Sequence, residues 1–120
     1  MNKIAILNCR KAAQNCCGTD CLRLLSERER SFAEYKGRHV RLAGIAACCG
    51  CENDPATDAD FGARLDHLEK AGVTQVHVSA CVTSEKRACP RRDAMFSALE
   101  ARGMEIRRMD EVRQSIQRNK

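Results

Sequence analysis

The sequence predicts a three-layer α/β fold, with an open, mostly parallel four-stranded sheet and helices on both faces. Short apolar runs alternate with amphipathic segments four times along the 120 residues. This alternation is typical of consecutive βα units with right-handed crossovers. The composition, 43% hydrophobic and 31% charged, is that of a globular chain, and its length suits one hydrophobic core.

The first βα unit is expected over residues 3–37. Residues 3–8, KIAILN, form a short apolar run that predicts a strand, and a cysteine-rich loop follows it. Thr19 or Asp20 can then cap a helix over about residues 21–35, which Gly37 would end. The expected core face of this helix contains Leu22, Leu25 and Phe32.

The second unit begins with a predicted strand at residues 40–47. The strand is broken by Cys48-Cys49-Gly50-Cys51, and a polar, acidic stretch follows. Thr57 or Asp58 can cap a helix that runs to about Ala71, with Gly72 as its stop. The apolar side of this helix is expected to hold Phe61, Leu65 and Leu68.

The last two strands are expected at residues 74–80, ending at Cys81, and at residues 104–108, where the signal is weaker. Between them a loop leads to Cys89-Pro90, and Pro90 suits the first position of a helix that continues to Gly103. These elements form one domain, residues 1–108. Residues 109–120 are expected to form a C-terminal helical tail, with Val112 and Ile116 at helical spacing.

The expected strand order is 2-1-3-4, as in flavodoxin-like and Rossmann-like sheets. In such a sheet ligands bind beyond the carboxyl ends of the strands, where the order reverses. Cys9, Cys48 and Cys81 end three strands that would lie side by side, about 4.8 Å apart. The loops that carry the other cysteines leave from the same edge, so topology predicts one sulfur-rich rim.

These cysteines predict a metal site at that rim. Cys48 and Cys51 have the CxxC spacing that chelates one tetrahedral ion or cluster. The sulfur count exceeds the needs of one zinc ion, and thiolates also hold iron–sulfur clusters, so both zinc and a cluster stay open. Cys17 and Cys49 have weaker support, because free cysteine often serves as a small buried hydrophobe. The candidate ligands are Cys9, Cys16, Cys21, Cys48, Cys51, Cys81 and Cys89.

Two further expectations concern the protonation state of the cysteines and whether histidines also bind the metal. Cys21 and Cys89 lie nearest a predicted helix start, where the helix dipole favours thiolate over thiol. The three histidines are not expected to be ligands. His77 lies mid-strand as a packed or partnered residue, His67 lies off the apolar stripe of its helix, and His39 precedes the second strand at the opposite end from the cysteines.

The sequence also narrows location and partners. It shows no secretory signal and no membrane-length apolar run, which predicts a cytoplasmic protein without a membrane partner. There thiols stay reduced, and nine cysteines cannot pair completely. The modest net charge of +5 and the scarcity of aromatic residues disfavour nucleic-acid binding. Expected partners are a redox or metal-transfer protein, or a second copy of the chain.

The motifs together resemble the CGGC-domain family of small cysteine-rich proteins. The resemblance rests on the cysteine ending the first strand, NCCGTDC, the central CCGC, VHVSAC and the CP before a helix. It covers about residues 3–108 and implies metal binding. The family's central motif would fall on residues 48–51, where Cys49 stands in place of a glycine. The tail helix would lie beyond the family core.

Two functions follow from these residues. The first is a small cytoplasmic metal-binding protein that stores or senses a metal, or transfers electrons if the metal is iron. The alternative is a thiol–disulfide redox protein that uses Cys48 and Cys51 as attacking and resolving thiols. An acidic loop, not a clear helix, follows this pair, which disfavours a thioredoxin-like role. No phosphate-binding loop or Ser/His/Asp set supports other catalysis.

Overall fold

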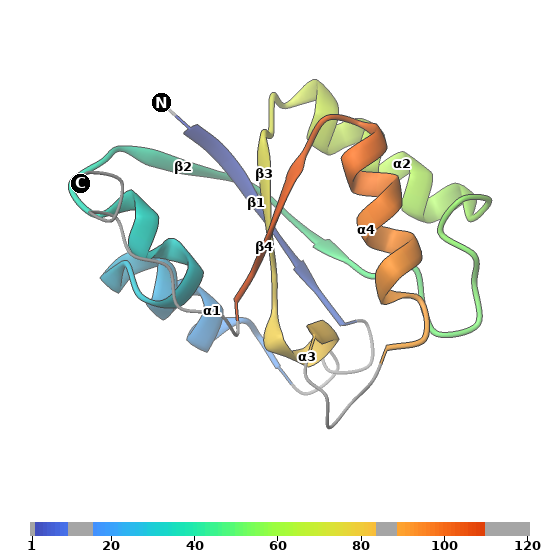
Figure 1. The fold of residues 1–120 in the computed structure, drawn as a ribbon, viewed down its shortest axis with the longest axis horizontal. Coiled ribbons are helices and arrows are strands. Elements are labelled where there is room, and N and C mark those ends of the chain that lie inside the picture. The colour runs from blue at the N-terminus through green and yellow to red at the C-terminus, as the bar shows by residue number, and fades with distance from the viewer. Residues whose placement is uncertain (1, 10–15, 84–88, 110–120) are drawn as a thin grey trace.

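The computed structural model describes residues 2–9, 16–83 and 89–109. It contains four parallel strands in the order β2-β1-β3-β4 (Figure 1), so the predicted fold class and strand order are confirmed. The strands are β1 (Asn2–Asn8), β2 (Val40–Ala47), β3 (Gln75–Val78) and β4 (Glu105–Arg108). The helices are α1 (Thr19–Glu27), the 3-10 helix η2 (Arg30–Tyr35), α2 (Ala59–Lys70), α3 (Ala80–Thr83) and α4 (Arg92–Ala101).

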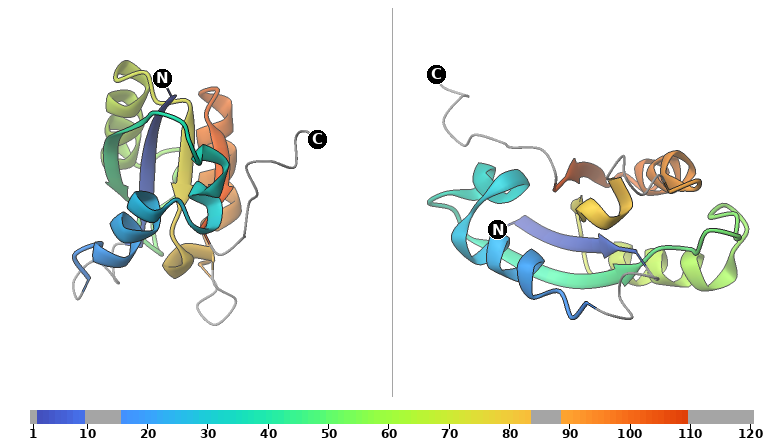
Figure 2. Two further views of the ribbon diagram at one scale, coloured as in Figure 1. Left: turned by 90° about the vertical axis from the view of Figure 1, so that its left-hand side faces the viewer. Right: turned by 90° about the horizontal axis from the view of Figure 1, so that it is seen from below.

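The helices cover both faces of the sheet, because side chains of the central strand β1 alternate between two cores. Ala5 and Leu7 join a core with α2 and α4, whereas Ile4 and Ile6 join a core with α1 and η2. Figures 1 and 2 show these helix pairs on opposite sides of the twisted sheet. The three-layer arrangement therefore follows from the period-2 pattern of one strand.

The α2 helix agrees with the sequence prediction. The Asp58 carboxylate accepts a hydrogen bond from the Phe61 amide at 2.8 Å, which is the expected capping interaction. The helix ends before Gly72, which has a positive φ of 84°. Its predicted core residues Phe61, Leu65 and Leu68 are all buried.

The prediction of one helix over residues 21–35 was wrong. The helix ends at Arg28, which takes the left-handed conformation (φ 56°) and donates its amide to the carbonyls of Leu24 and Leu25. The Arg28 guanidinium also donates to Leu25 O at 2.6 Å, so this residue closes the helix without a glycine. Leu22, predicted to be in the core, is 39% exposed, and Leu24 packs against the core beside Leu25.

Two other boundaries differ from the prediction. The strand β3 ends at Val78, and Cys81 lies in the short helix α3 that follows. The helix α4 begins at Arg92, because a turn with Arg92 N bonded to Cys89 O places Pro90 before the helix. The proposed tail helix, with Val112 and Ile116, lies outside the described residues. No helix in the described part of the chain is long and apolar enough to cross a membrane.

Candidate metal centre

The carboxyl ends of β1, β2 and β3 meet at one edge of the sheet (Figure 1). Backbone hydrogen bonds continue past the paired strands there, from Cys48 N to Asn8 O at 2.8 Å and from Ser79 N to Leu7 O at 2.9 Å. Each of the three strands is therefore followed at this edge by a cysteine-bearing segment. The topological basis of the predicted sulfur rim is present.

Cys9 and Cys81 contact each other across this edge. The amide of Cys9 lies 3.2 Å from Cys81 Sγ, and Ser79 Oγ lies 2.6 Å from the same sulfur. Cys81 Sγ thus accepts a hydrogen bond from the segment after β1 and shares a second one, in which either atom can donate, with Ser79 of its own segment. Ser79 was not predicted as a site residue, and its position two residues before Cys81 is the only sequence signal for this contact.

The CCGC loop, residues 48–51, turns its second cysteine inward. Cys49 is fully buried, and its thiol donates toward the carbonyls of Gly50 at 3.3 Å and Asn53 at 3.4 Å. Asn53 Nδ2 returns a hydrogen bond to Cys49 O at 2.8 Å. Gly50 has φ 96°, a conformation that glycine adopts without steric cost. The loop is closed on itself around the Cys49 side chain.

Cys89 approaches the CCGC loop from the start of α4. The guanidinium of Arg91 donates from Nε to Cys51 O at 3.2 Å, which holds the 89–91 segment beside that loop. Cys48 is buried in the core under α2 and α4, and Cys9, Cys81 and Cys89 pack against the same core. Thiols from three crossovers therefore share one face of the sheet edge.

The first loop contributes differently. Cys16 and Cys17 are exposed, and Cys16 Sγ accepts a hydrogen bond from Gly18 N at 3.3 Å. Cys21 is half-buried on α1 and packs against the core on the opposite face of the sheet. None of the nine cysteines, all of which lie within the described residues, forms a disulfide.

Burial dominates the protonation of three thiols. It raises the pKa of Cys21, Cys49 and Cys89, and neighbouring thiols raise each pKa further. The pKa of Cys21 is raised by Cys81 and Cys16, and that of Cys49 by Cys48 and Cys89. The pKa of Cys89 is raised by Cys48, Cys51 and Cys9. The expectation that helix starts favour thiolate at Cys21 and Cys89 was wrong in net direction, because desolvation of the charged form prevails.

The donor set fits a thiophilic metal in chemistry but is not preassembled around an ion. Thiolates suit zinc and iron–sulfur clusters alike. Within the described ranges, no three Cys, His, Asp or Glu side chains form a group that could hold a metal ion. Any metal complex at this edge therefore requires the loop side chains to move relative to this arrangement.

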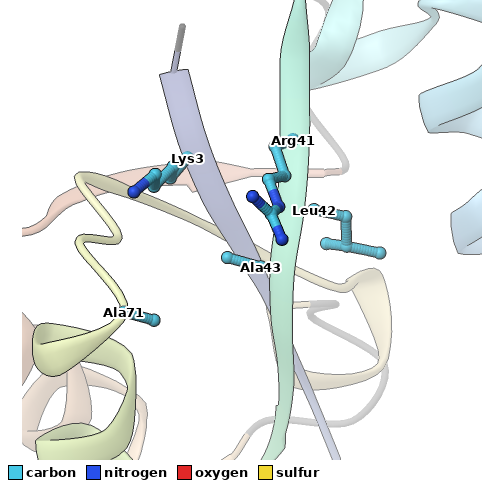
Figure 3. A pocket seen from close by; sticks show the side chains of 5 residues that line it. All are labelled: Lys3, Arg41, Leu42, Ala43 and Ala71. Atoms are coloured by element: carbon cyan, nitrogen blue, oxygen red, sulfur yellow. The ribbon is translucent and has the colours of Figure 1, made fainter.

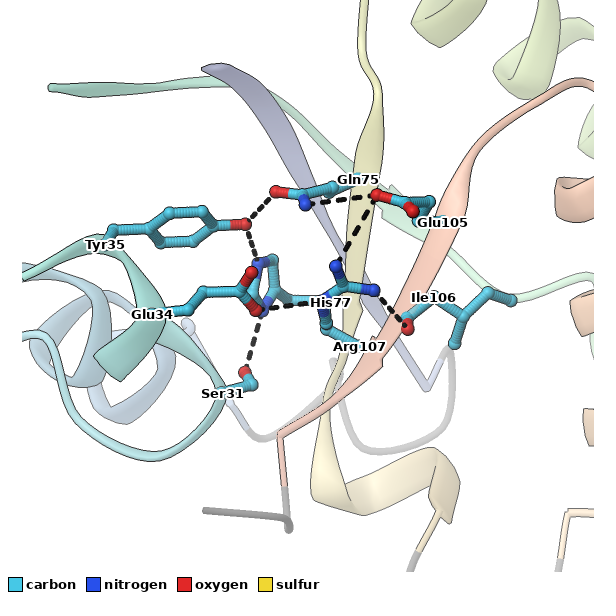
Figure 4. Close-up of polar contacts among 8 residues, drawn as sticks. All are labelled: Ser31, Glu34, Tyr35, Gln75, His77, Glu105, Ile106 and Arg107. Carbon is cyan, nitrogen blue, oxygen red and sulfur yellow. Dashed lines mark hydrogen bonds and ion pairs between the residues drawn. The ribbon is translucent and has the colours of Figure 1, made fainter. Parts of the chain in front are cut away.

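His77 is a packed and partnered residue, as predicted. Its buried ring bonds to Ser31 Oγ through Nδ1 and to Tyr35 OH through Nε2, both at 2.7 Å (Figure 4). It also stacks on Phe32 with ring centroids 4.2 Å apart. His39 and His67 are exposed.

A family model for the CGGC domain matches residues 3–109 of the chain. The chain belongs to the CGGC-domain family. Comparisons with curated proteins and with solved structures found no match. The match spans all four strands of the sheet, so the CGGC domain and the described α/β unit are the same part of the chain. The family is cysteine-rich, which agrees with metal binding without naming a metal.

This CGGC domain also has a hollow of about 330 Å³ away from the sulfur atoms. It is lined by Lys3, Arg41, Leu42, Ala43 and Ala71 (Figure 3). Lys3 and Arg41 are register partners near the amino ends of β1 and β2, whereas the cysteine segments follow the carboxyl ends. The hollow is therefore not part of the candidate metal centre.

Proposed function

We propose that the carboxyl edge of the sheet binds a thiophilic metal, as zinc or as an iron–sulfur cluster, through cysteine thiolates. The observation that carries the proposal is the convergence of cysteine-bearing segments after β1, β2 and β3, with Cys9 N in contact with Cys81 Sγ. Membership of a cysteine-rich family supports the same role.

The proposed ligands come from the loops at this edge. Cys9, Cys48, Cys51, Cys81 and Cys89 have the strongest support, because their segments contact one another or share one core. Cys16 and Cys21 would extend the set from the first loop. Within the described part of the chain Cys17 has no contact that favours a ligand role, and the inward thiol of Cys49 favours a structural one.

Electrostatics supports a cation at this position. Thiols that raise one another's pKa would repel once ionised. A bound cation offsets that repulsion and releases protons as thiolates form. A bound zinc ion would supply a redox-inert tetrahedral link between loops, and an iron–sulfur cluster would supply one-electron redox capacity. The first suits storage or sensing of the metal, the second electron transfer.

The thiol–disulfide alternative has less support at the CxxC pair. Cys48 is only 4% exposed, so its sulfur is poorly placed to attack a disulfide on another protein. The next helix in the chain, α2, begins at Ala59, eight positions after Cys51, so the pair does not stand at the start of the helix that follows it. An exposed nucleophile at a helix start is what that chemistry favours.

The deciding experiment is anaerobic purification followed by an ultraviolet–visible spectrum, elemental analysis and assay of acid-labile sulfide. Visible absorption with iron and sulfide would identify a cluster, and a colourless protein with stoichiometric zinc would identify a zinc site. A metal-free protein that binds neither zinc nor a reconstituted cluster, and that reduces a disulfide substrate, would replace this proposal with the redox alternative.

The same proposal sets the expected location and partners. Reduced thiols are required for ligation, which favours the cytoplasm. A protein that delivers or removes the metal, or exchanges electrons with it, would be the partner. A second copy of the chain is the other partner we propose, and size-exclusion chromatography with and without metal would test it.

A further inference from the structure

The side chain of Arg64, a residue of α2, forms hydrogen bonds with the backbone at the start of the CCGC loop. Its Nε donates to Ala47 O at 3.1 Å and its Nη2 donates to Cys48 O at 3.0 Å. The guanidinium carbon also lies 5.7 Å from the centroid of the buried Phe61 ring. A planar fork of donors is suited to binding two consecutive carbonyls, and the ring limits its orientation.

The side chain of Arg91, at the start of α4, forms a hydrogen bond with the backbone at the other end of the loop. It occupies the position just before that helix, and its Nε donates to Cys51 O at 3.2 Å. Because Arg91 is two residues from Cys89, the same contact fixes the Cys89 segment next to the loop. The CCGC loop is therefore attached at its first and last cysteines to two different helices.

Both guanidinium groups also place positive charge against the backbone of the CCGC loop. Arg64 and Arg91 are partly buried, and neither forms an ion pair with any carboxylate in the described residues. By contrast, Arg102 pairs with Asp66 and Glu69, and Arg107 pairs with Glu34. Partly buried charges are normally compensated, and thiolates formed at Cys48 and Cys51, whose carbonyls these groups contact, would provide that compensation.

The geometry points to Arg64 and Arg91 as positioning residues that hold the CCGC loop and balance the negative charge of its metal-bound thiolates. This inference rests on the proposed function. Residues that orient metal ligands typically contribute 10- to 100-fold to metal affinity. Here each arginine is expected to contribute at least about tenfold, by limiting loop motion and by stabilising the ligated, negatively charged state.

Metal titration of variants separates these two effects. Cd²⁺ binding is followed by its thiolate charge-transfer absorption, with a competing chelator to obtain affinities. Arg64→Gln and Arg91→Gln remove the charge and are expected to weaken Cd²⁺ binding about tenfold or more. Arg91→Lys restores one donor and the charge and should recover most affinity. Arg64→Lys should recover only part, because one ammonium cannot reproduce the two-pronged contact. Arg102→Gln, which alters a pair away from the loop, is the matched control.

Alkylation of the metal-free protein provides an independent measurement. Peptide mass spectrometry should show faster iodoacetamide labelling of Cys48 in Arg64→Gln and of Cys51 in Arg91→Gln than in wild type or Arg102→Gln, with unchanged circular dichroism. Wild-type affinity and wild-type labelling in both glutamine variants would overturn the inference. Where Arg64→Gln does not fold, the Arg64→Lys and Arg91 variants decide it. Absence of Cd²⁺ and zinc binding in wild type would instead overturn the proposed function.

Discussion

Cys49 is the cysteine of the CCGC loop whose surroundings favour a structural role over a role as metal ligand. Its side chain is fully buried in the core under α2 and α4, and its thiol donates to two carbonyls of its own loop. Those contacts need the protonated form, and burial raises the pKa of this thiol. These contacts favour a packing role for Cys49, which the resemblance places at a glycine position of the family's central motif.

The variant Cys49→Ala tests this assignment. We expect unfolding to become easier by about 1–2 kcal/mol, because a buried sulfur is lost and a small cavity remains. Metal stoichiometry should stay at the wild-type value in elemental analysis of the purified protein. Cys51→Ala is the comparison, and its stoichiometry or affinity should fall. A lower metal content in Cys49→Ala would make Cys49 a ligand after all.

His77 is the centre of a directional hydrogen-bond chain on the opposite face of the sheet (Figure 4). The Tyr35 hydroxyl donates to Gln75 Oε1, so at its bond with His77 it must accept from Nε2–H. At Nδ1 the ring bonds to Ser31 Oγ, and the direction of this hydrogen bond depends on whether that nitrogen carries a proton. Both ring nitrogens have a partner, and the chain ties η2 to β3.

Replacement of His77 with alanine should therefore cost about 2–5 kcal/mol of unfolding free energy. The loss combines a cavity beside Phe32 with the removal of partners for Ser31 and Tyr35. Urea denaturation measures the change, and the exposed His67→Ala serves as its control. Equal stabilities of the two variants would show that the chain contributes nothing.

At the scale of elements, capping explains why α2 was predictable and α1 was not. Asp58 provides a side-chain acceptor for α2, which sequence patterns reveal directly. The end of α1 instead depends on Arg28 in a left-handed conformation and on its side chain reaching Leu25 O. Arginine has no preference for that conformation, so no local signal marked the break before η2.

The Asp58 cap allows a simple test of this element. Asp58→Ala should lower the unfolding free energy by about 1 kcal/mol, because the Phe61 amide loses its acceptor. Thermal or urea unfolding measures the effect. Asp60→Ala changes an exposed carboxylate in the same first turn, and a loss as large as that of Asp58→Ala would mean that general charge near the helix start, not the cap, is responsible.

The candidate site was predictable to the extent that topology determines it. Parallel strands in the order 2-1-3 necessarily bring the segments after them to one edge, so Cys9, Cys48 and Cys81 could be grouped from sequence. Arg64 and Ser79 could not, because their roles depend on side-chain contacts with distant or adjacent loops. Contacts between residues far apart in the sequence cannot be read from it, and neither an arginine nor a serine indicates a metal site alone.

At the scale of the whole molecule, the polar contacts around His77 and the sulfur-rich edge lie in different parts of the domain. The core shared by α1, η2 and β3 contains buried polar contacts that fix His77, Ser31 and Tyr35. The carboxyl edge carries thiols whose raised pKa values record crowding and burial. The polar contacts around His77 are thus formed within the protein itself, whereas the thiolates of the sulfur edge would be neutralised by the cation that we propose.

This contrast predicts opposite pH dependence for the metal-free and metal-loaded protein. In the metal-free protein the folded pKa values of Cys21, Cys49 and Cys89 lie above the unfolded value of about 9. The unfolded state therefore loses protons first, so the stability that these groups contribute is present below pH 9 and is lost as pH rises through the folded values.

With metal bound, protons compete for the ligand thiolates, so the stability of the fold should instead fall as the solution becomes acidic. Urea denaturation between pH 5 and 11, with and without metal, measures both limbs. If the metal-free protein became more stable above pH 9, the claim that burial and neighbouring thiols raise these pKa values in the folded state would be wrong.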